Sequence, residues 1–204
     1  MRLLFEGGIV VWIIFIIGGI GLILMLERFL FYHRAQINST EFLNGVRNVL
    51  KRNNFVEAIS ICDATPGPVP HIVKTAILNR SRDPEQLKEI VRETSLSEIP
   101  HLESRLNIIT VIAQIAPLLG LFGTVIGVIE LFSVVQHQGF FIHPGIFAEK
   151  IWKALVSTAV GLGVAIVCYT GHSVLTISLN NIIADMEKAA VEIINTLTDN
   201  NGNQ

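Results

Sequence analysis

Charged side chains are scarce in this chain of 204 residues: Asp, Glu, Lys and Arg make up 16% of it, whereas half of the residues are hydrophobic. Soluble globular domains usually carry about 25% charged residues. The formal net charge is only −2, so there is no positive field to attract a phosphate backbone. The composition therefore favours a membrane protein and argues against nucleic acid as a partner.

Cysteines and clustered metal ligands are also few. Cys62 lies in a polar segment and Cys168 in an apolar one, which argues against a disulfide between them, so we expect two free thiols. The six histidines show no repeated short spacing, and the pair His137 and His143 has no cysteine or carboxylate nearby in sequence. The sequence thus predicts neither a metal site nor a bound cofactor.

What the chain does contain is three long apolar stretches, from about residue 8 to 26, 107 to 135 and 154 to 179. A helix needs about 20 apolar residues to cross a bilayer, and each stretch is long enough. The first stretch exceeds the apolar region of a signal peptide and lacks a small-x-small cleavage site, so we expect it to be a retained anchor. The fold class predicted is an all-α membrane protein with three transmembrane helices and cytoplasmic helical extensions.

Basic residues are distributed unevenly around these spans. Eleven of the fifteen lie between the first and second spans: Arg28, Arg34, Arg47, Lys51, Arg52, Lys74, Arg80, Arg82, Lys88, Arg92 and Arg105. Because positive loops stay in the cytoplasm, this bias places the N-terminus outside and the C-terminus inside. The predicted segments are the N-terminal end with the first span, the cytoplasmic segment, the second span, an outer loop, the third span and a cytoplasmic C-terminal helix with its tail: 1–35, 36–106, 107–135, 136–150, 151–179 and 180–204.

The cytoplasmic segment has helical patterns. Thr40 is predicted to cap a first helix, the Pro-rich run at 65–70 to break the pattern, and Asp83 to cap a new helix with Pro at its first position. Pro100 is expected to kink this helix on its way to the second span. The tail at 180–198 also has helical periodicity, and we expect these helices to bundle together.

Polar and small residues share one face on each of the second and third spans, counted at about 100° per residue. On the third span the face comprises Thr158, Ala165, Tyr169, His172 and Thr176, with Gly161 beside it. On the second span it comprises Thr110, Gln114, Pro117, Leu121, Thr124 and Val128. Polar groups in a membrane normally face an interior, so these faces are predicted to line one. The candidate pore or proton-path residues are Thr124, Thr158, Gln114, Tyr169 and His172.

These residues also have ordinary structural explanations. Thr124 and Thr158 could bond back to carbonyls one turn earlier or join neighbouring helices. His172 could cap a helix at the interface, and Tyr169 could serve in packing. Small residues let membrane helices approach closely, and we expect this packing role for four glycines: Gly120, Gly123, Gly127 and Gly161.

A proton path through hydrocarbon generally uses a carboxylate, and the three spans contain one candidate, Glu130. It lies about 120° around the helix from Thr124 and near the outer end. We expect it to be interfacial, near water or paired with Lys150 or Lys153. If ions cross here, a second protein is expected to bring the carboxylate.

Three segments carry a resemblance to a known family: Glu27-Arg28, the run from Ala116 to Gly127, and the run from Ala154 to Leu162. They resemble the MotA/TolQ/ExbB proton channel family, most closely its ExbB/TolQ branch. The resemblance implies a homopentamer in the bacterial inner membrane, with a periplasmic N-terminus and with Thr124 and Thr158 in a central pore. It also implies that the pore holds the single transmembrane helices of an ExbD- or TolR-like partner, whose membrane Asp would be the missing carrier.

The resemblance further implies that proton flow drives a TonB- or TolA-like periplasmic protein, for outer-membrane import or envelope maintenance. Two positions depart from the family pattern: Lys153 stands where the pattern has Glu, and Val167 replaces a Pro. The alternatives are a MotA-like flagellar stator and a non-conducting membrane scaffold. An enzyme is not expected, because the spans hold no Ser-His or paired-Asp constellation.

Overall fold

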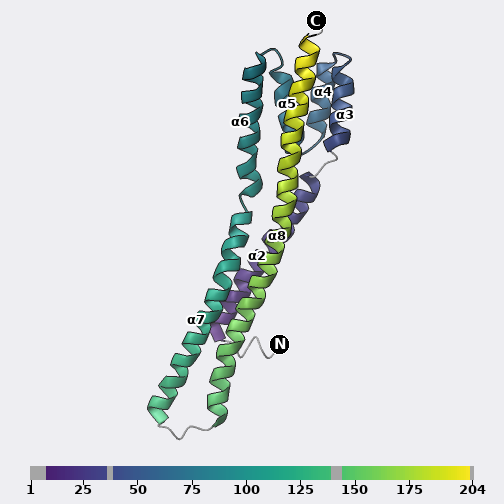
Figure 1. Ribbon diagram of the computed structural model, residues 1–204. Coiled ribbons are helices and arrows are strands. Elements are labelled where there is room, and N and C mark those ends of the chain that lie inside the picture. Colours follow the sequence, from purple (N-terminus) through teal and green to yellow (C-terminus); the bar gives the residue numbers. More distant parts are fainter. Residues whose placement is uncertain (1–7, 36–38, 139–143, 203–204) are drawn as a thin grey trace. The chain divides into compact units, whose positions relative to one another are not determined.

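The computed structural model describes residues 8–35, 39–138 and 144–202, and within them all regular structure is α-helical (Figure 1). The helices in chain order are α2 (Gly8–Ala35), α3 (Ser39–Leu50), α4 (Phe55–Ala64), α5 (Pro68–Leu78), α6 (Pro84–Glu103), α7 (Leu106–Gln138) and α8 (Pro144–Gly202). Three helical stretches, containing α2, α7 and α8, are long and apolar enough to cross a membrane. This agrees with the predicted all-α membrane class.

The chain divides into two compact units. The first, here called the apolar unit, contains the described residues up to Glu27 together with Arg105–Val174. The second, here called the bundle unit, contains the described residues of Arg28–Ser104 and those from Leu175 onward.

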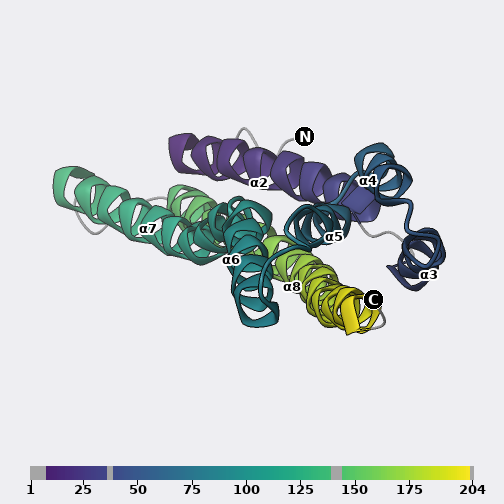
Figure 2. The same ribbon diagram turned by 90° about the horizontal axis from the view of Figure 1, so that it is seen from above.

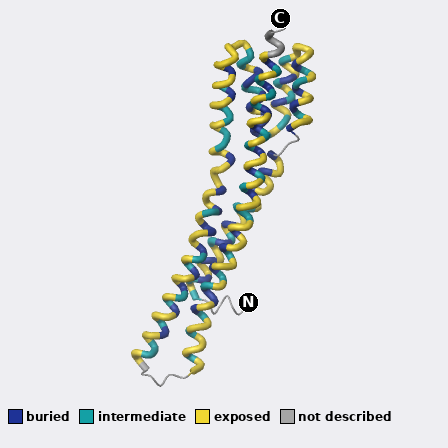
Figure 3. The backbone as a smooth tube through the Cα atoms, in the orientation of Figure 1, coloured by how far each residue is buried: buried dark blue, intermediate teal, exposed yellow. Residues whose placement is uncertain are grey.

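In the apolar unit, α7 buries one side and exposes the other (Figure 3). Ile109, Ala113 and Ala116 are fully buried, whereas the large side chains of Leu118 and Phe122 are more than half exposed. Exposed apolar residues of this size also run along α2 and along α8 as far as Val174. Soluble proteins rarely carry such continuous apolar surfaces, so this unit needs lipid or another protein around it.

In the bundle unit, α5 packs between α4 and α6, and α3 packs on α4 (Figure 2). The side chains of Ile72, Val73, Ala76 and Ile77 are all fully buried. These positions recur at intervals of three and four residues, so one continuous face of α5 lies in the core. The expected helical bundle is therefore present, and α5 is its central element.

The start of α5 differs from the prediction. The Pro-rich run was expected only to break helical structure, yet α5 begins inside it, with Pro68 at the first helical position. Proline is well suited to that position because the first helical N–H has no intrahelical partner. Gly67 precedes it with φ +134°, a conformation that residues with a Cβ rarely adopt. Helical structure is thus interrupted only at residues 65–67. The Gly-Pro pair marks the start of α5.

Helix caps were predicted with mixed success. Asp83 is the N-cap residue of α6 and Pro84 follows it, as expected. The prediction for Thr40 was wrong: α3 already includes Ser39, so Thr40 lies within its first turn. The side chain that does cap is Asn54, whose Oδ1 accepts from the Glu57 backbone N–H at 3.3 Å.

The interruption before α7 also lies elsewhere than expected. Helix α6 continues through Pro100 and ends at Glu103, and a turn at residues 104–105 separates it from α7. The Leu102 carbonyl accepts from the Tyr32 hydroxyl at 2.7 Å and from an Arg28 guanidinium nitrogen at 3.4 Å. These two side-chain donors thus satisfy a carbonyl in the last turn of α6, where backbone carbonyls lack intrahelical donors.

Two predicted boundaries are shifted at α7 and α8. Helix α7 extends to Gln138 and α8 begins at Pro144, so much of the interval 136–150 is helical rather than loop. His143 lies outside the described residues. The third apolar stretch and the C-terminal helix are one continuous helix, because no Gly or Pro occurs between His172 and Asn201.

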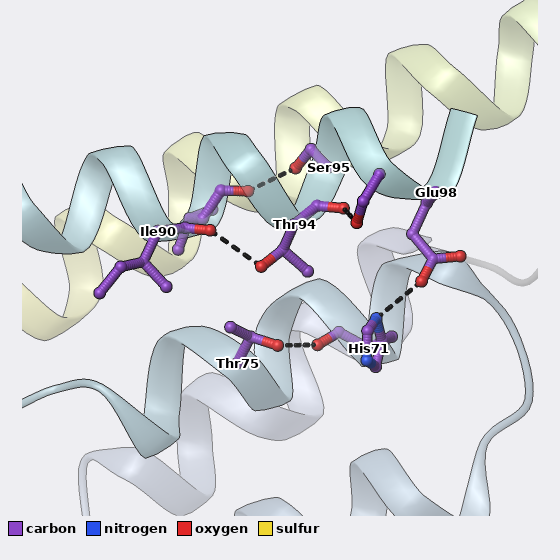
Figure 4. Close-up of polar contacts among 8 residues, drawn as sticks. His71, Thr75, Ile90, Thr94, Ser95 and Glu98 are labelled. Atoms are coloured by element: carbon purple, nitrogen blue, oxygen red, sulfur yellow. Dashed lines mark hydrogen bonds and ion pairs between the residues drawn. The ribbon is translucent and has the colours of Figure 1, made fainter. Parts of the chain in front are cut away.

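Polar contacts join α5 to α6 on one side of the bundle (Figure 4). His71 Nδ1 lies 2.9 Å from a Glu98 carboxylate oxygen. The hydroxyls of Thr75, Thr94 and Ser95 instead donate to carbonyls one turn earlier in their own helices. Among these drawn residues, only the His71–Glu98 contact ties the two helices together.

Both cysteines are free and buried, as predicted. Cys62 lies on the inner side of α4. Burial raises the pKa of the Cys62 thiol to about 11; the neighbouring Asp63 adds to the rise and Lys74 opposes it. This thiol is thus neutral and inert near pH 7.

Candidate functional site

The candidate site is built on the contact between α7 and α8, where two glycines replace side chains. A Cβ at Gly120 would lie 3.0 Å from the Ser157 carbonyl oxygen, and one at Gly161 would lie 2.6 Å from the Ala116 carbonyl oxygen. Backbone atoms cannot move away from such a Cβ, whereas the end of a flexible side chain can. The two helices therefore approach this closely only because both positions are glycine.

Two further glycines extend this contact towards the C-terminal end of α7. A Cβ at Gly123 would lie 2.7 Å from the Ser157 Cβ, and one at Gly127 would lie 2.7 Å from the Ala154 Cβ. Gly120, Gly123 and Gly127 are spaced by three and four residues, which places them on one side of α7. We call this contact, formed by Ala116, Gly120, Gly123 and Gly127 with Ala154, Ser157, Thr158 and Gly161, the glycine seam.

Two hydroxyls of α8 converge on one carbonyl of α7 within the seam. Thr158 Oγ1 donates to the Gly120 carbonyl at 3.1 Å, and Ser157 Oγ lies 3.3 Å from the same oxygen. Ser157 is 1% exposed and also donates to the Ala154 carbonyl at 2.7 Å. Sequence reasoning missed Ser157, although its place beside Thr158 in a run of small residues could have suggested it.

The hydroxyl of Thr124 takes a local partner. Its Oγ1 donates to the Leu121 carbonyl at 2.5 Å, three residues earlier in α7, and the residue is half-buried. Within a single chain, Thr158 thus joins neighbouring helices and Thr124 bonds back to its own helix. Both threonines lie within one turn of the Gly120 carbonyl, one on each helix.

The remaining candidate residues do not gather around these threonines in one chain. Gln114 is exposed, Tyr169 is 48% exposed, and His172 is half-buried. A primary amide exposed on an apolar helix would meet hydrocarbon if lipid covered it, and this is costly. Gln114 and Tyr169 thus place polar groups on exposed sides of otherwise apolar helices.

Near the glycine seam, Pro117 leaves one backbone carbonyl of α7 without its usual hydrogen-bond donor. It lies inside α7 and has no N–H, so the Ala113 carbonyl lacks its usual partner four residues later. Ala113 is fully buried. In the first third of α7, the Ala113 carbonyl is thus without the intrahelical donor that it would otherwise have.

The single carboxylate of the apolar stretches is already paired. Lys150 Nζ donates to a Glu130 carboxylate oxygen at 2.8 Å, which confirms the expected lysine partner. Glu130 and Lys153 both line a cavity of about 350 Å³, together with Gly8 and Gly127. No group of three potential metal ligands occurs in the part of the chain that the structure describes.

Comparisons with known proteins place this chain among transport proteins. Residues 65–188, more than half of the chain, match the model of the MotA/TolQ/ExbB proton channel family. A putative biopolymer transport protein ExbB homolog of Methanothermobacter thermautotrophicus is 26% identical over 195 residues, which are 95% of this chain and 67% of the relative. The biopolymer transport protein exbB1 of Vibrio cholerae is 27% identical over 88% of this chain and 80% of its own length. The Tol-Pal system protein TolQ of Haemophilus influenzae is 34% identical over 92 residues, 43% of this chain and 38% of that protein.

Proposed function

Since this chain belongs to the MotA/TolQ/ExbB proton channel family, we propose that it is a proton-channel subunit of the bacterial inner membrane. Together with an ExbD- or TolR-like single-span partner, it would use the proton motive force to energise a TonB- or TolA-like protein. The names of its relatives, biopolymer transport protein and Tol-Pal system protein, support this role over that of a flagellar stator.

One observation carries the proposal: polar residues lie on exposed sides of otherwise apolar helices. Gln114 of α7 and Tyr169 of α8 need a protein partner or a polar interior, which a single chain does not provide. A ring of copies with α7 and α8 innermost satisfies both residues at once. We infer a homopentamer whose central pore is lined by Gln114, Thr124, Thr158, Tyr169 and His172.

The ring also explains the absence of a free carboxylate. Glu130 is bonded to Lys150, so the described parts of the three apolar stretches supply hydroxyls but no carboxylate free of a cation. The partner's single helix would bring that carboxylate into the pore. The glycine seam would hold α7 and α8 at a fixed separation, so that Thr124 and Thr158 remain at one level of the wall.

The proposed orientation follows from the basic residues between α2 and α7. The N-terminus would be periplasmic, the bundle unit and the C-terminal tail would be cytoplasmic, and the short connection between α7 and α8 would be periplasmic.

Proton flux into vesicles tests the role of the pore. The protein and its partner are reconstituted together, and a pH-sensitive dye inside reports flux driven by a membrane potential. Thr124→Val should reduce partner-dependent flux at least tenfold, because the valine removes the hydroxyl but keeps the shape. The control is Thr170→Val, since Thr170 is an exposed threonine of α8 that donates to the Ile166 carbonyl and lies off the candidate face.

Two outcomes would count against the proposal. Equal flux in the two variants would show that the Thr124 hydroxyl has no part in conduction. A complex that assembles with its partner but carries no flux in any variant would favour the non-conducting scaffold.

A further inference from the structure

The side of α6 that faces away from the bundle core is acidic. Glu85, Glu89 and Glu93 are all exposed, and at 100° per residue they fall within one arc of about 80°. The exposed apolar side chain of Leu96 lies in the same arc, and it also lines a cavity between α6 and α8 of its own chain, which Val191 lines as well. Lys88 pairs with Glu85 at 2.8 Å, whereas Glu89 and Glu93 have no cation within salt-bridge distance among the described residues.

A groove on another side of the bundle unit carries one net positive charge. It lies between α3 and α8, holds about 730 Å³ and is lined by three cations and two carboxylates. Arg47 is neutralised by Glu192, but Lys51 has no carboxylate partner among the residues described. Val191, at 61% exposed, forms part of the lining.

The position of Lys51 along the groove can be fixed from printed contacts. Lys188 donates to the Thr40 hydroxyl at 3.4 Å and Arg47 pairs with Glu192, so α3 and α8 run in the same direction. Lys51 is one turn past Arg47, and it therefore lies beyond Val191, towards the C-terminal end of α8.

We propose that α6 of one copy docks in the groove between α3 and α8 of the next copy. The inference rests on the proposed function, because it supplies the contact between neighbours in the proposed ring. Figures 1 and 2 place α6 and α3 on opposite sides of the bundle unit, so one copy can offer its α6 while its groove receives another. Such a head-to-tail contact is the kind that closes into a ring.

The direction of the helices agrees with this docking. Within the bundle unit, α6 and the C-terminal part of α8 run in opposite directions (Figure 1). In a ring all copies point the same way, so α6 would also run opposite to the α8 of its neighbour. With Leu96 on Val191, the carboxylate of Glu93, three residues earlier, would lie about 4.5 Å along the groove towards Lys51. Glu89 would follow on the same side, so acidic and basic groups meet in register.

Cross-linking of the full chain in detergent tests the contact. Native mass spectrometry first measures the number of copies in the wild-type complex. A variant with both Glu93→Cys and Lys51→Cys is then treated with a short bis-maleimide, with Cys62 and Cys168 replaced by alanine. The expected product is a covalent ladder that rises to the full number of copies, and it should be absent from either single-cysteine variant.

Charge reversal provides a second, independent measurement. Lys51→Glu should shift dissociation of the complex to subunit concentrations at least tenfold higher, and adding Glu89→Lys with Glu93→Lys should reverse the shift. The matched control is Ser60→Glu, which adds a negative charge at an exposed position of α4 that belongs to neither surface.

The outcomes separate the two proposals. A ring that gives no ladder and does not respond to charge reversal would overturn the α6 contact while leaving the channel subunit in place. A wild-type protein that never exceeds one copy would overturn both.

Discussion

The two units of this protein are held together in opposite ways. In the apolar unit, α7 and α8 meet through glycines and hydroxyls, and their large side chains point outward. In the bundle unit, α5 places large aliphatic side chains inside, and charged residues lie outside. In water, burial of large apolar groups drives folding, whereas in lipid close backbone approach must replace it. The packing of the apolar unit thus suits a lipid environment, and the packing of the bundle unit suits water.

The largest loss of stability is expected when a large side chain is removed from the core of the bundle unit. Ile72→Ala removes a fully buried side chain and should cost about 3 kcal/mol of bundle stability, from lost burial and the cavity left behind. Limited proteolysis in detergent measures this as faster cleavage within residues 39–103. Val56→Ala is the control, since Val56 is 80% exposed on the neighbouring helix. Equal cleavage of the two variants would show that α5 is not the central element.

The next effect concerns the glycine seam. Gly161→Ala places a Cβ against the Ala116 carbonyl, and we expect about 2 kcal/mol of destabilisation from the forced separation of the helices. The control is Gly163→Ala, where a Cβ would meet no atom within 4 Å. Thermal unfolding of the detergent complex, followed by circular dichroism, compares them. A Gly161→Ala protein as stable as its control would mean that α7 and α8 separate at little cost.

A smaller effect is expected at the end of α6. Tyr32→Phe removes the hydroxyl that donates to the Leu102 carbonyl, and it should cost about 1 kcal/mol. Hydrogen exchange of the amides of residues 103–107 gives a local measurement, and exchange should accelerate there while α5 is unaffected. Unchanged exchange would show that Arg28 alone holds this carbonyl.

The smallest effect is a pH dependence in the bundle unit. With a folded-state pKa near 11 against an ordinary value of 9.0, Cys62 favours its neutral form when folded. Its contribution to stability is complete below pH 9 and is lost as the pH rises from 9 to 11. Alkylation by iodoacetamide should therefore be slow at pH 8 and should accelerate about tenfold per pH unit up to 11, unlike a cysteine placed at exposed Val56. A rate that levels off near pH 9 would contradict the raised pKa.

The sequence predicted the helical class and the three apolar helices because long apolar runs have few other solutions. It also predicted the lysine partner of Glu130, since an isolated carboxylate near hydrocarbon is costly. It failed at Thr40, and it did not predict the break at residues 104–105, which lies beside the bond from Tyr32 to Leu102, a contact distant in sequence. Ser157 was missed for the same reason: its partner, the Gly120 carbonyl, lies 37 residues away.

The glycine seam also bears on how this chain can change over generations. Every single-base change at a glycine codon that replaces the residue adds at least a Cβ or ends the chain, and at Gly120 and Gly161 a Cβ would meet backbone atoms. Outward positions such as Leu118 and Phe122 face no such barrier and can exchange among large apolar residues. Among descendants of this gene, the residues of α7 in the glycine seam should therefore change least. The large exposed residues of α7 should be replaced by other large apolar residues more often.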